Sequence, residues 1–230
     1  MSKIDYKGWE LEHFDNSNNF RNYQNDLFKK HLRGYAAEVG PGNGENLQIY
    51  KDKVDILELY EPSKVLYDNL KSKFGSDKKF IINNEVFSLK ENTYDSILYL
   101  DVLEHIENDH QEIMKAFNSL KEGGKLIINV PAFQHLYSNF DKDVKHFRRY
   151  NKKTLLKLIT NLNYLSYELK YYDSLGYILS LMSKLFTKNY KNNFNKKIKI
   201  WNSLIPLSKI LDTLIFHSFG KSLILIITKK

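Results

Sequence analysis

Residues 35–44 read Tyr-Ala-Ala-Glu-Val-Gly-Pro-Gly-Asn-Gly, and this stretch decides the fold. An apolar run ends at an acid, Glu38, and glycines then occupy every second position at Gly40, Gly42 and Gly44. The pattern predicts a strand followed by a turn in which a nucleotide-like ligand lies against bare backbone. The spacing E-x-G-x-G-x-G differs from the dinucleotide fingerprint G-x-G-x-x-G, whose sixth position is glycine. An ordinary strand-to-helix turn of an α/β protein remains the alternative interpretation.

The composition is that of a globular protein. The chain has 230 residues, of which 42% are hydrophobic and 27% charged, and this size suits one α/β domain with additions. Cysteine is absent, which excludes disulfides, thiolate catalysis and cysteine-based metal sites and fits a reducing cytoplasm, where we expect the protein to reside. Residues 1–7 contain no apolar signal core, and no window is apolar enough to predict a transmembrane helix.

The excess positive charge lies in the C-terminal third. The formal net charge is +8, and residues 151–230 contain 14 Lys and Arg residues but only 3 Asp and Glu residues. Such an asymmetry favours an anionic partner, for example a phosphorylated substrate, a membrane surface or a nucleic acid. A solvated basic face without a partner is an equally good interpretation.

Strands and helices alternate along most of the chain. Hydrophobic periodicity predicts strands at 35–39, 54–59, 80–82, 96–100, 125–130, 164–172 and 222–228, and helices at 16–33, 63–73, 108–120 and 152–162. We therefore expect a mostly parallel sheet with helices on both faces and a ligand at the carboxyl ends of the strands. The glycines at 123–124 are expected to end the helix that begins near residue 108.

An interruption between the last two strands divides the single expected domain, residues 1–230. Residues 174–216 combine an apolar run, a basic stretch that includes Lys188, and an amphipathic run, which predicts a helical insertion or lid. The other parts are an N-terminal helical cap at 1–33, a ligand-binding core at 34–172 and a last strand at 222–228.

An acid follows the second expected strand. Glu61 lies 21 residues after Gly40, and this is roughly the spacing at which a βαβ nucleotide unit places a carboxylate on the ribose hydroxyls. The alternative is an exposed carboxylate in a turn. Together with the glycine turn, Glu61 predicts a ligand that contains adenosine.

A second motif identifies the type of ligand. Residues 94–106 read Tyr-Asp-Ser-Ile-Leu-Tyr-Leu-Asp-Val-Leu-Glu-His-Ile. With the glycine motif and Glu61-Pro62-Ser63 in the same order, this segment resembles the class I S-adenosylmethionine-dependent methyltransferases. The resemblance implies an enzyme with a Rossmann-like sheet of seven strands, the last one antiparallel, and S-adenosylmethionine bound across the tips of the first strands.

The resemblance also implies which residues contact the cofactor. Glu38 matches the acid that attracts the cofactor's ammonium group, and Tyr23 matches an aromatic side chain that closes over the cofactor in some members. Simple helix packing is the alternative for Tyr23. The usual Gly-Asp near the adenine is absent, so that contact falls on Asn84, Glu85 or Ser88. The complete implied set is Tyr23, Glu38, Gly40, Pro41, Gly42, Gly44, Glu61, Pro62, Asn84, Glu85 and Asp101.

A third motif resembles a bacterial subset of the family that acts on small molecules. It comprises Val130-Pro131, Asp141 and the run His146-Phe147-Arg148-Arg149-Tyr150. The resemblance implies methyl transfer to an oxygen or nitrogen of a small acceptor, for example in pathways of polysaccharide biosynthesis that make cell-surface sugars. His146 is the first candidate for a base, because the pKa of histidine suits proton transfer near neutral pH.

The neighbouring residues have candidate roles as well, partly from their chemistry and partly from the resemblance. Asp141 would orient the His146 ring or bind substrate. The resemblance places His105 near the sulfonium and the acceptor, as a further catalytic candidate, and a structural or cofactor-adjacent histidine is the alternative. Arg148 and Arg149, with Tyr150, would bind an anionic acceptor, since guanidinium groups bind carboxylates and phosphates through two hydrogen bonds. A structural salt-bridged corner that supports the next helix is the alternative for this group.

Rival functions have weaker support. A nucleic-acid methyltransferase would use the basic C-terminal third, but residues 100–103 read Leu-Asp-Val-Leu, whereas base-amino methyltransferases have an [Asp/Asn]-Pro-Pro-aromatic motif there. A non-catalytic S-adenosylmethionine-binding module is disfavoured by the intact glycines. We expect no nucleic-acid partner and, since the histidines are scattered, no metal site. A homodimer and a weak membrane-surface contact through residues 174–216 remain open.

Overall fold

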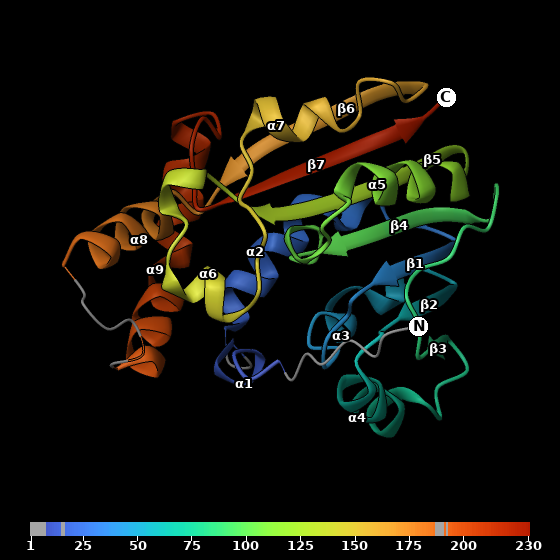
Figure 1. The fold of residues 1–230 in the computed structure, drawn as a ribbon, viewed down its shortest axis with the longest axis horizontal. Coiled ribbons are helices and arrows are strands. Elements are labelled where there is room, and N and C mark those ends of the chain that lie inside the picture. Colours follow the sequence, from blue (N-terminus) through green and yellow to red (C-terminus); the bar gives the residue numbers. More distant parts are fainter. Residues whose placement is uncertain (1–7, 15–16, 187–190, 192) are drawn as a thin grey trace.

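A twisted seven-stranded sheet forms the centre of the protein (Figure 1). The computed structural model describes residues 8–14, 17–186, 191 and 193–230, so what the sequence predicts for residues 1–7 and for Lys188 lies outside the described residues. The strands are β1 (Tyr35–Val39), β2 (Ile56–Tyr60), β3 (Phe80–Asn83), β4 (Tyr94–Leu100), β5 (Leu120–Pro131), β6 (Tyr164–Tyr172) and β7 (Ser222–Lys229).

The strand order is β3-β2-β1-β4-β5-β7-β6. β7 is antiparallel to both of its neighbours, and the pairs among β1 to β5 are all parallel. This confirms the predicted Rossmann-like sheet with an antiparallel last strand. The order reverses between β1 and β4, and the carboxyl ends of these two strands therefore border the crevice in which such sheets bind ligands.

Helices cover both faces of the sheet, as the alternating pattern predicts. Side chains of α5 and α7 pack in one hydrophobic core, whereas those of α2, α3, α4 and α9 pack in the other. The helices are α1 (Leu11–Phe14), α2 (Asn18–Phe28), α3 (Leu47–Tyr50), α4 (Lys64–Phe74), α5 (Asp109–Ser119), α6 (Asn139–Asp143), α7 (Lys152–Lys157), α8 (Ser174–Phe186) and α9 (Phe194–Leu214).

Local side-chain chemistry fixes several helix starts. Ser63 accepts a hydrogen bond from the Leu66 amide at the start of α4, and Asn151 accepts one from the Thr154 amide at the start of α7. Such caps satisfy backbone amides that have no partner within the helix.

The start of β5 and the role of the two glycines before it differ from the sequence prediction. α5 ends at Ser119 and β5 begins at Leu120, so the glycines at 123–124 lie within a strand and do not end the helix. Leu120 pairs with Tyr94 of β4, and this pairing extends the sheet across the glycines. Strand pairing between distant segments has therefore overridden the local helix-stop signal.

The insertion between β6 and β7 is anchored to the sheet by two buried aspartates. Asp212 of α9 accepts hydrogen bonds from the Tyr23 hydroxyl of α2 (2.8 Å) and from the Ser174 amide (3.0 Å). Asp173 accepts one from the Trp201 indole (2.7 Å). These contacts hold α8 and α9 beside α2 at the carboxyl end of the sheet (Figure 1). Over the described residues, the structure contains no helix long and apolar enough to cross a membrane.

Candidate active site

The glycine turn after β1 is folded in a way that requires glycine. The φ angles of Gly40, Gly42 and Gly44 are +66°, +61° and +79°, a region that side chains disfavour. A Cβ on Gly40 would lie 2.8 Å from Val102, and one on Gly44 would lie 2.6 Å from Phe74. The backbone at this turn therefore approaches its neighbours closely. The Gly42 amide donates a hydrogen bond to a carboxylate that follows β2.

That carboxylate is Glu61, which follows β2 and is only 4% exposed. Its oxygens accept hydrogen bonds from the Gly42 amide (3.2 Å) and the Ser63 amide (2.9 Å), the latter across Pro62. Burial raises the pKa of Glu61 to about 7, although both hydrogen bonds oppose the change. Glu61 thus connects the glycine turn to the end of β2, at the place expected of a ribose-binding acid.

Glu38 occupies the end of β1 and is 2% exposed. The Tyr50 hydroxyl of α3 donates a hydrogen bond to it, and sequence reasoning did not identify this partner. Burial raises the pKa of Glu38 to about 7, and the hydrogen bond from Tyr50 opposes this rise. A buried carboxyl with a pKa near neutrality ionises readily when a cationic ligand approaches.

Asn84 and Glu85 are exposed immediately after β3. The Asn84 side-chain amide donates a hydrogen bond to the Glu61 carbonyl (2.9 Å), which places Asn84 beside the expected ribose acid. Their contact with an adenine ring remains a prediction.

Asp101, at the end of β4, has a φ angle of +59°, and such strain in a non-glycine residue is common at functional sites. Its carboxylate accepts hydrogen bonds from the side chains of Gln24 (3.0 Å) and Asn129 (2.8 Å). Tyr23, the neighbour of Gln24, is 3% exposed and directs its hydroxyl to Asp212. The structure therefore favours helix packing for Tyr23 and gives Gln24, which sequence reasoning missed, the place beside Asp101.

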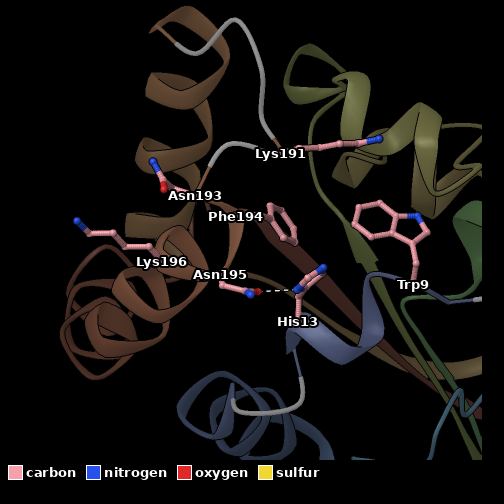
Figure 2. Close-up of a pocket in the computed structure, with 7 residues that line it drawn as sticks. All are labelled: Trp9, His13, Lys191, Asn193, Phe194, Asn195 and Lys196. Atoms are coloured by element: carbon pink, nitrogen blue, oxygen red, sulfur yellow. Dashed lines mark hydrogen bonds between the residues drawn. The ribbon is translucent and has the colours of Figure 1, made fainter.

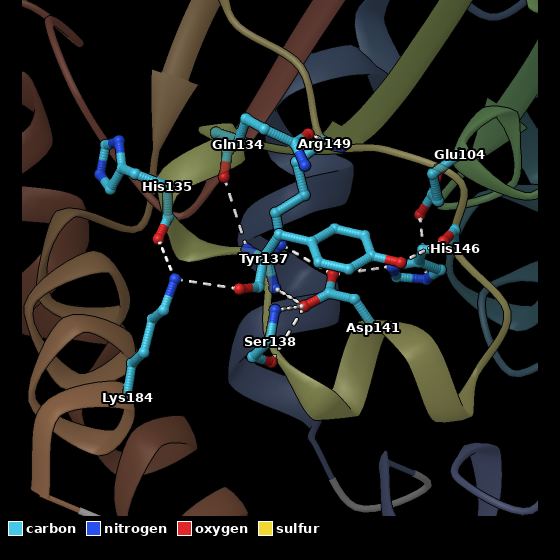
Figure 3. A network of polar contacts seen from close by, with 10 residues as sticks. Glu104, Gln134, His135, Tyr137, Ser138, Asp141, His146, Arg149 and Lys184 are labelled. Atoms are coloured by element: carbon cyan, nitrogen blue, oxygen red, sulfur yellow. Dashed lines mark hydrogen bonds and ion pairs between the residues drawn. The ribbon is translucent and has the colours of Figure 1, made fainter.

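The loop after β5 brings Asp141, His146 and Arg149 together (Figure 3). Asp141 is fully buried and accepts hydrogen bonds from His146 Nδ1 (2.9 Å), Arg149 Nε (2.7 Å) and Arg149 Nη2 (3.0 Å). Burial opposes ionisation, but the bonds from His146 and Arg149 prevail and lower the pKa of Asp141. The expected Asp141–His146 pair is thus present, and Arg149 neutralises the buried carboxylate.

Arg148 and Tyr150 contact residues 106–109, which follow the turn after β4. Arg148 pairs with Asp109 (2.6 Å) and donates to the carbonyls of Ile106 (3.2 Å) and Glu107 (2.8 Å). The Tyr150 hydroxyl also donates to Asp109 (2.8 Å). These contacts support the interpretation as a salt-bridged corner, and direct binding of substrate by the pair remains a prediction.

His105 and Glu104 lie in the 3₁₀ turn that follows β4. The rings of His105 and His146 are perpendicular, with centroids 4.5 Å apart. Burial and the nearby His146 lower the pKa of His105 to about 3, so its imidazole is neutral at pH 7. Burial raises the pKa of Glu104, which is 1% exposed. Sequence reasoning did not select Glu104 as a site residue.

A cavity of about 740 Å³ opens beside this loop, between α6, α8 and α9. Its lining is largely apolar and includes Phe140 and Trp201, but it also carries Arg149 and Lys221. Lys221 Nζ lies 4.0 Å from the centre of the Trp201 ring. Loss of solvation lowers the pKa of Lys221, and the nearby charges of Asp173, Asp101 and Asp141 oppose this shift. The charge of Lys221, which lies in the cavity lining just before β7, therefore interacts with that of Asp101 at the end of β4.

A second cavity, of about 520 Å³, lies where α1 meets the start of α9 (Figure 2). Its walls include Trp9, His13 and Phe194, and His13 is hydrogen-bonded to Asn195. A Cβ on Gly42 would lie 3.1 Å from Leu11 of α1. α1 therefore covers the glycine turn and is itself held by α9.

Comparison with known proteins agrees with this geometry. A family model described as a methyltransferase domain matches residues 11–167. An uncharacterised protein of Methanocaldococcus jannaschii, MJ1123, is 28% identical over 127 residues, which span 55% of this chain and 57% of that protein.

Solved structures share the fold at low sequence identity. A SAM-dependent methyltransferase from Archaeoglobus fulgidus superposes with a TM-score of 0.63 at 16% identity, over 96% of this chain and 98% of the other. Phosphoethanolamine N-methyltransferase 2 of Haemonchus contortus, in complex with S-adenosyl-L-methionine, gives 0.64 at 12% identity, over 96% of this chain and 57% of the other. The chain belongs to the methyltransferase-domain family and has the Rossmann-like fold of the class I S-adenosylmethionine-dependent methyltransferases.

Proposed function

We propose that this enzyme methylates an oxygen or nitrogen of a small anionic metabolite, such as an acidic sugar. Its methyl donor is S-adenosylmethionine, which supplies an electrophilic methyl group when bound. The residues present fit that cofactor, because the positive φ angles and close contacts of the glycine turn leave backbone where side chains would intrude. The buried carboxyls of Glu38 and Glu61 suit an ammonium group and ribose hydroxyls, respectively.

The observation that carries the acceptor proposal is the cavity beside the loop after β5. Its apolar walls exclude water from a bound metabolite, while Arg149 and Lys221 supply positive charge. Since Arg149 is paired with Asp141, Lys221 is the better partner for an anionic group. Its Nζ contacts the Trp201 ring, and no hydrogen bond to it is found among the described residues.

The residues at the loop prepare the acceptor for reaction. Methyl transfer depends mainly on holding the two reactants in line at short distance, and a shaped cavity achieves this. Asp141 fixes the orientation of the His146 ring through Nδ1, so that the second ring nitrogen, Nε2, points away from Asp141. We assign to His146 the activation of the acceptor's reacting atom.

A screen of acceptors tests the proposal. The purified enzyme and S-adenosylmethionine are incubated with matched anionic and neutral metabolites, and methylated products are detected by mass spectrometry. Lys221→Met should lower kcat/KM for the anionic acceptor by about 10- to 100-fold, the value of one charge-assisted contact. Lys125→Met is the control, because Lys125 Nζ lies away from the cavity and donates to the Thr228 hydroxyl. Equal activity of the Lys221 variant, or methylation of neutral acceptors alone, would contradict the anionic class.

A further inference from the structure

Three groups that commonly bind metal ions converge where the turn after β4 meets the loop after α6. Glu104, His105 and His146 each offer one ligand atom, and these atoms all lie within 4.8 Å of one another. Glu104 and His105 are adjacent in sequence, whereas His146 comes from a loop beyond β5, so the cluster exists only in the folded chain. Figure 3 shows Glu104 pointing toward His146.

One oxygen of the buried Glu104 carboxylate has no hydrogen-bond partner within the part of the chain that the structure describes. Glu104 is 1% exposed, and its Oε2 has no hydrogen bond among the described residues. Its Oε1 lies 3.8 Å from His146 Nε2, which is too long for a hydrogen bond. Two ligands bound to one zinc ion at about 2.1 Å lie about 3.4 Å apart in a tetrahedral site. The separation of Glu104 Oε1 and His146 Nε2 is close to this distance.

The surroundings of the two histidines resemble those of metal ligands. His146 Nδ1 donates to the buried Asp141 carboxylate (2.9 Å), which leaves Nε2 as an acceptor facing Glu104. The backbone of Val144 and Lys145 hydrogen-bonds to His105. Histidines that bind metals usually donate their second ring N–H to a carboxylate or a backbone carbonyl, because this contact fixes the ring and raises its basicity.

We propose that Glu104, His105 and His146 form a binding site for one divalent transition-metal ion, such as Zn²⁺ or Mn²⁺. Two imidazoles and one carboxylate are typical ligands of such ions and leave a coordination position open, whereas Mg²⁺ and Ca²⁺ prefer oxygen ligands. At the open position the ion would bind the acceptor's oxygen or nitrogen, and His146 would then act as a ligand and not as a base. This catalytic role rests on the proposed function, but the metal site itself does not.

Direct titration tests the site. The protein is treated with a chelator and dialysed, S-adenosylhomocysteine binding is confirmed by calorimetry, and Zn²⁺ is then titrated. One ion should bind per chain, and Co²⁺ should give the visible absorption of a site with nitrogen and oxygen ligands. Because the chain contains no cysteine, thiolate absorption cannot obscure that spectrum.

Matched variants locate the site. His105→Gln and His146→Gln should each weaken Zn²⁺ binding by at least about 100-fold, and Asp141→Asn by about 10- to 100-fold. His110→Gln is the control, because His110 is exposed on α5 and lies outside the cluster. Each variant is checked for melting temperature and S-adenosylhomocysteine binding, so that a misfolded variant is recognised. If Glu104→Gln fails to fold, the two histidine variants decide the question.

Two results would overturn the metal site. One is the absence of stoichiometric binding at up to about 1 mM Zn²⁺ or Mn²⁺ in a protein that binds S-adenosylhomocysteine. The other is unchanged affinity in both histidine variants. Failure of the wild type to bind S-adenosylhomocysteine would instead contradict the methyltransferase function, so the two failures are distinguishable.

Discussion

At the scale of single residues, the candidate cofactor site combines backbone that only glycine provides with carboxyls whose pKa values burial raises to about 7. The three turn glycines have left-handed φ angles. Glu38 and Glu61 have exposed fractions of 2% and 4% and pKa values of about 7. Both features allow a ligand to be recognised by groups that are already in place.

Gly42→Val should abolish detectable S-adenosylhomocysteine binding, a loss of at least about 100-fold, because the new side chain strains the turn and fills the space under α1. Calorimetry measures the loss. Gly123→Val is the matched control, since Gly123 also has a positive φ angle, +69°, but lies in β5 with only Arg33 nearby. Wild-type affinity in the Gly42 variant would show that the turn does not hold the cofactor.

Binding of S-adenosylhomocysteine should release protons near pH 7. Burial raises the pKa values of Glu38 and Glu61 to about 7, while an ammonium group and ribose hydroxyls favour the ionised carboxylates. For each group, affinity should fall by up to about tenfold per pH unit below pH 7. Calorimetry in buffers of different ionisation enthalpy counts the protons, and Glu61→Gln should reduce the count. Exposed Glu91→Gln should not, and a count of zero in the wild type would contradict the assignment.

The same shifts determine how the ligand-free protein responds to pH. Because the folded-state pKa values of Glu38 and Glu61 exceed the unfolded value of about 4.5, these groups bind protons more tightly in the native state. Their contribution to stability is therefore complete below about pH 4.5 and is lost as the pH rises through about 7. The nearby charges of Glu45 and Arg21 act on Glu38 in opposite directions, so burial remains the dominant cause.

At the scale of elements, the loop between β5 and α7 is held by one buried carboxylate. Asp141 receives hydrogen bonds from Ser138, His146 and Arg149, which come from both sides of α6. The side chain of Arg149 is 7% exposed, so this ion pair is protected from water. The loop thus lines the cavity in which we propose that the acceptor binds.

Asp141→Asn should destabilise the protein by about 3–5 kcal/mol, because Arg149 would keep its buried charge without a counter-ion. Asp143→Asn on the same helix should cost less than about 1 kcal/mol, since its pair with Lys191 (2.9 Å) is exposed. Urea unfolding at pH 7 compares the two variants. The pKa of Asp141 is lowered in the folded state, so its contribution is present above about pH 4 and is lost as the pH falls. Equal costs for the two variants would show that the loop has other supports.

At the scale of the whole molecule, the insertion closes one side of the cavity and exposes apolar side chains along α9. α8 and α9 close the cavity, while Leu207, Ile210 and Leu214 of α9 are 50%, 59% and 67% exposed. Their spacing places the three on one side of the helix. A helix in a basic region that exposes apolar side chains on one side is typical of membrane-surface contacts and dimer interfaces.

The membrane alternative predicts that the protein sediments with anionic liposomes at low salt, and that Ile210→Asp with Leu214→Asp weakens this binding. Neutral liposomes are the control for the charge contribution. A protein that stays in the supernatant at low salt contradicts the membrane alternative. Light scattering that then finds a dimer in the wild type and a monomer in the double variant would assign the face to a second copy of the chain.

The sequence determined the fold and the identity of the cofactor, and it predicted the side of the sheet where the cofactor would bind. Strand periodicity, the glycine turn, Glu61 and the 94–106 motif are local patterns, and local patterns report backbone conformation and the order of elements reliably. Even so, β5 begins at Leu120, five residues before the predicted strand, because pairing of Leu120 with Tyr94 involves a distant strand.

The tertiary structure decided what the polar side chains do. Only the folded chain shows that Arg149 is paired with Asp141, that Tyr23 donates to Asp212, and that Gln24 donates to Asp101. Glu104 and His146 come together although 41 residues separate them. Partner choice and burial depend on contacts between segments far apart in sequence, and no local pattern encodes them. This is why the cofactor was predictable, whereas the cavity beside the loop after β5 was not.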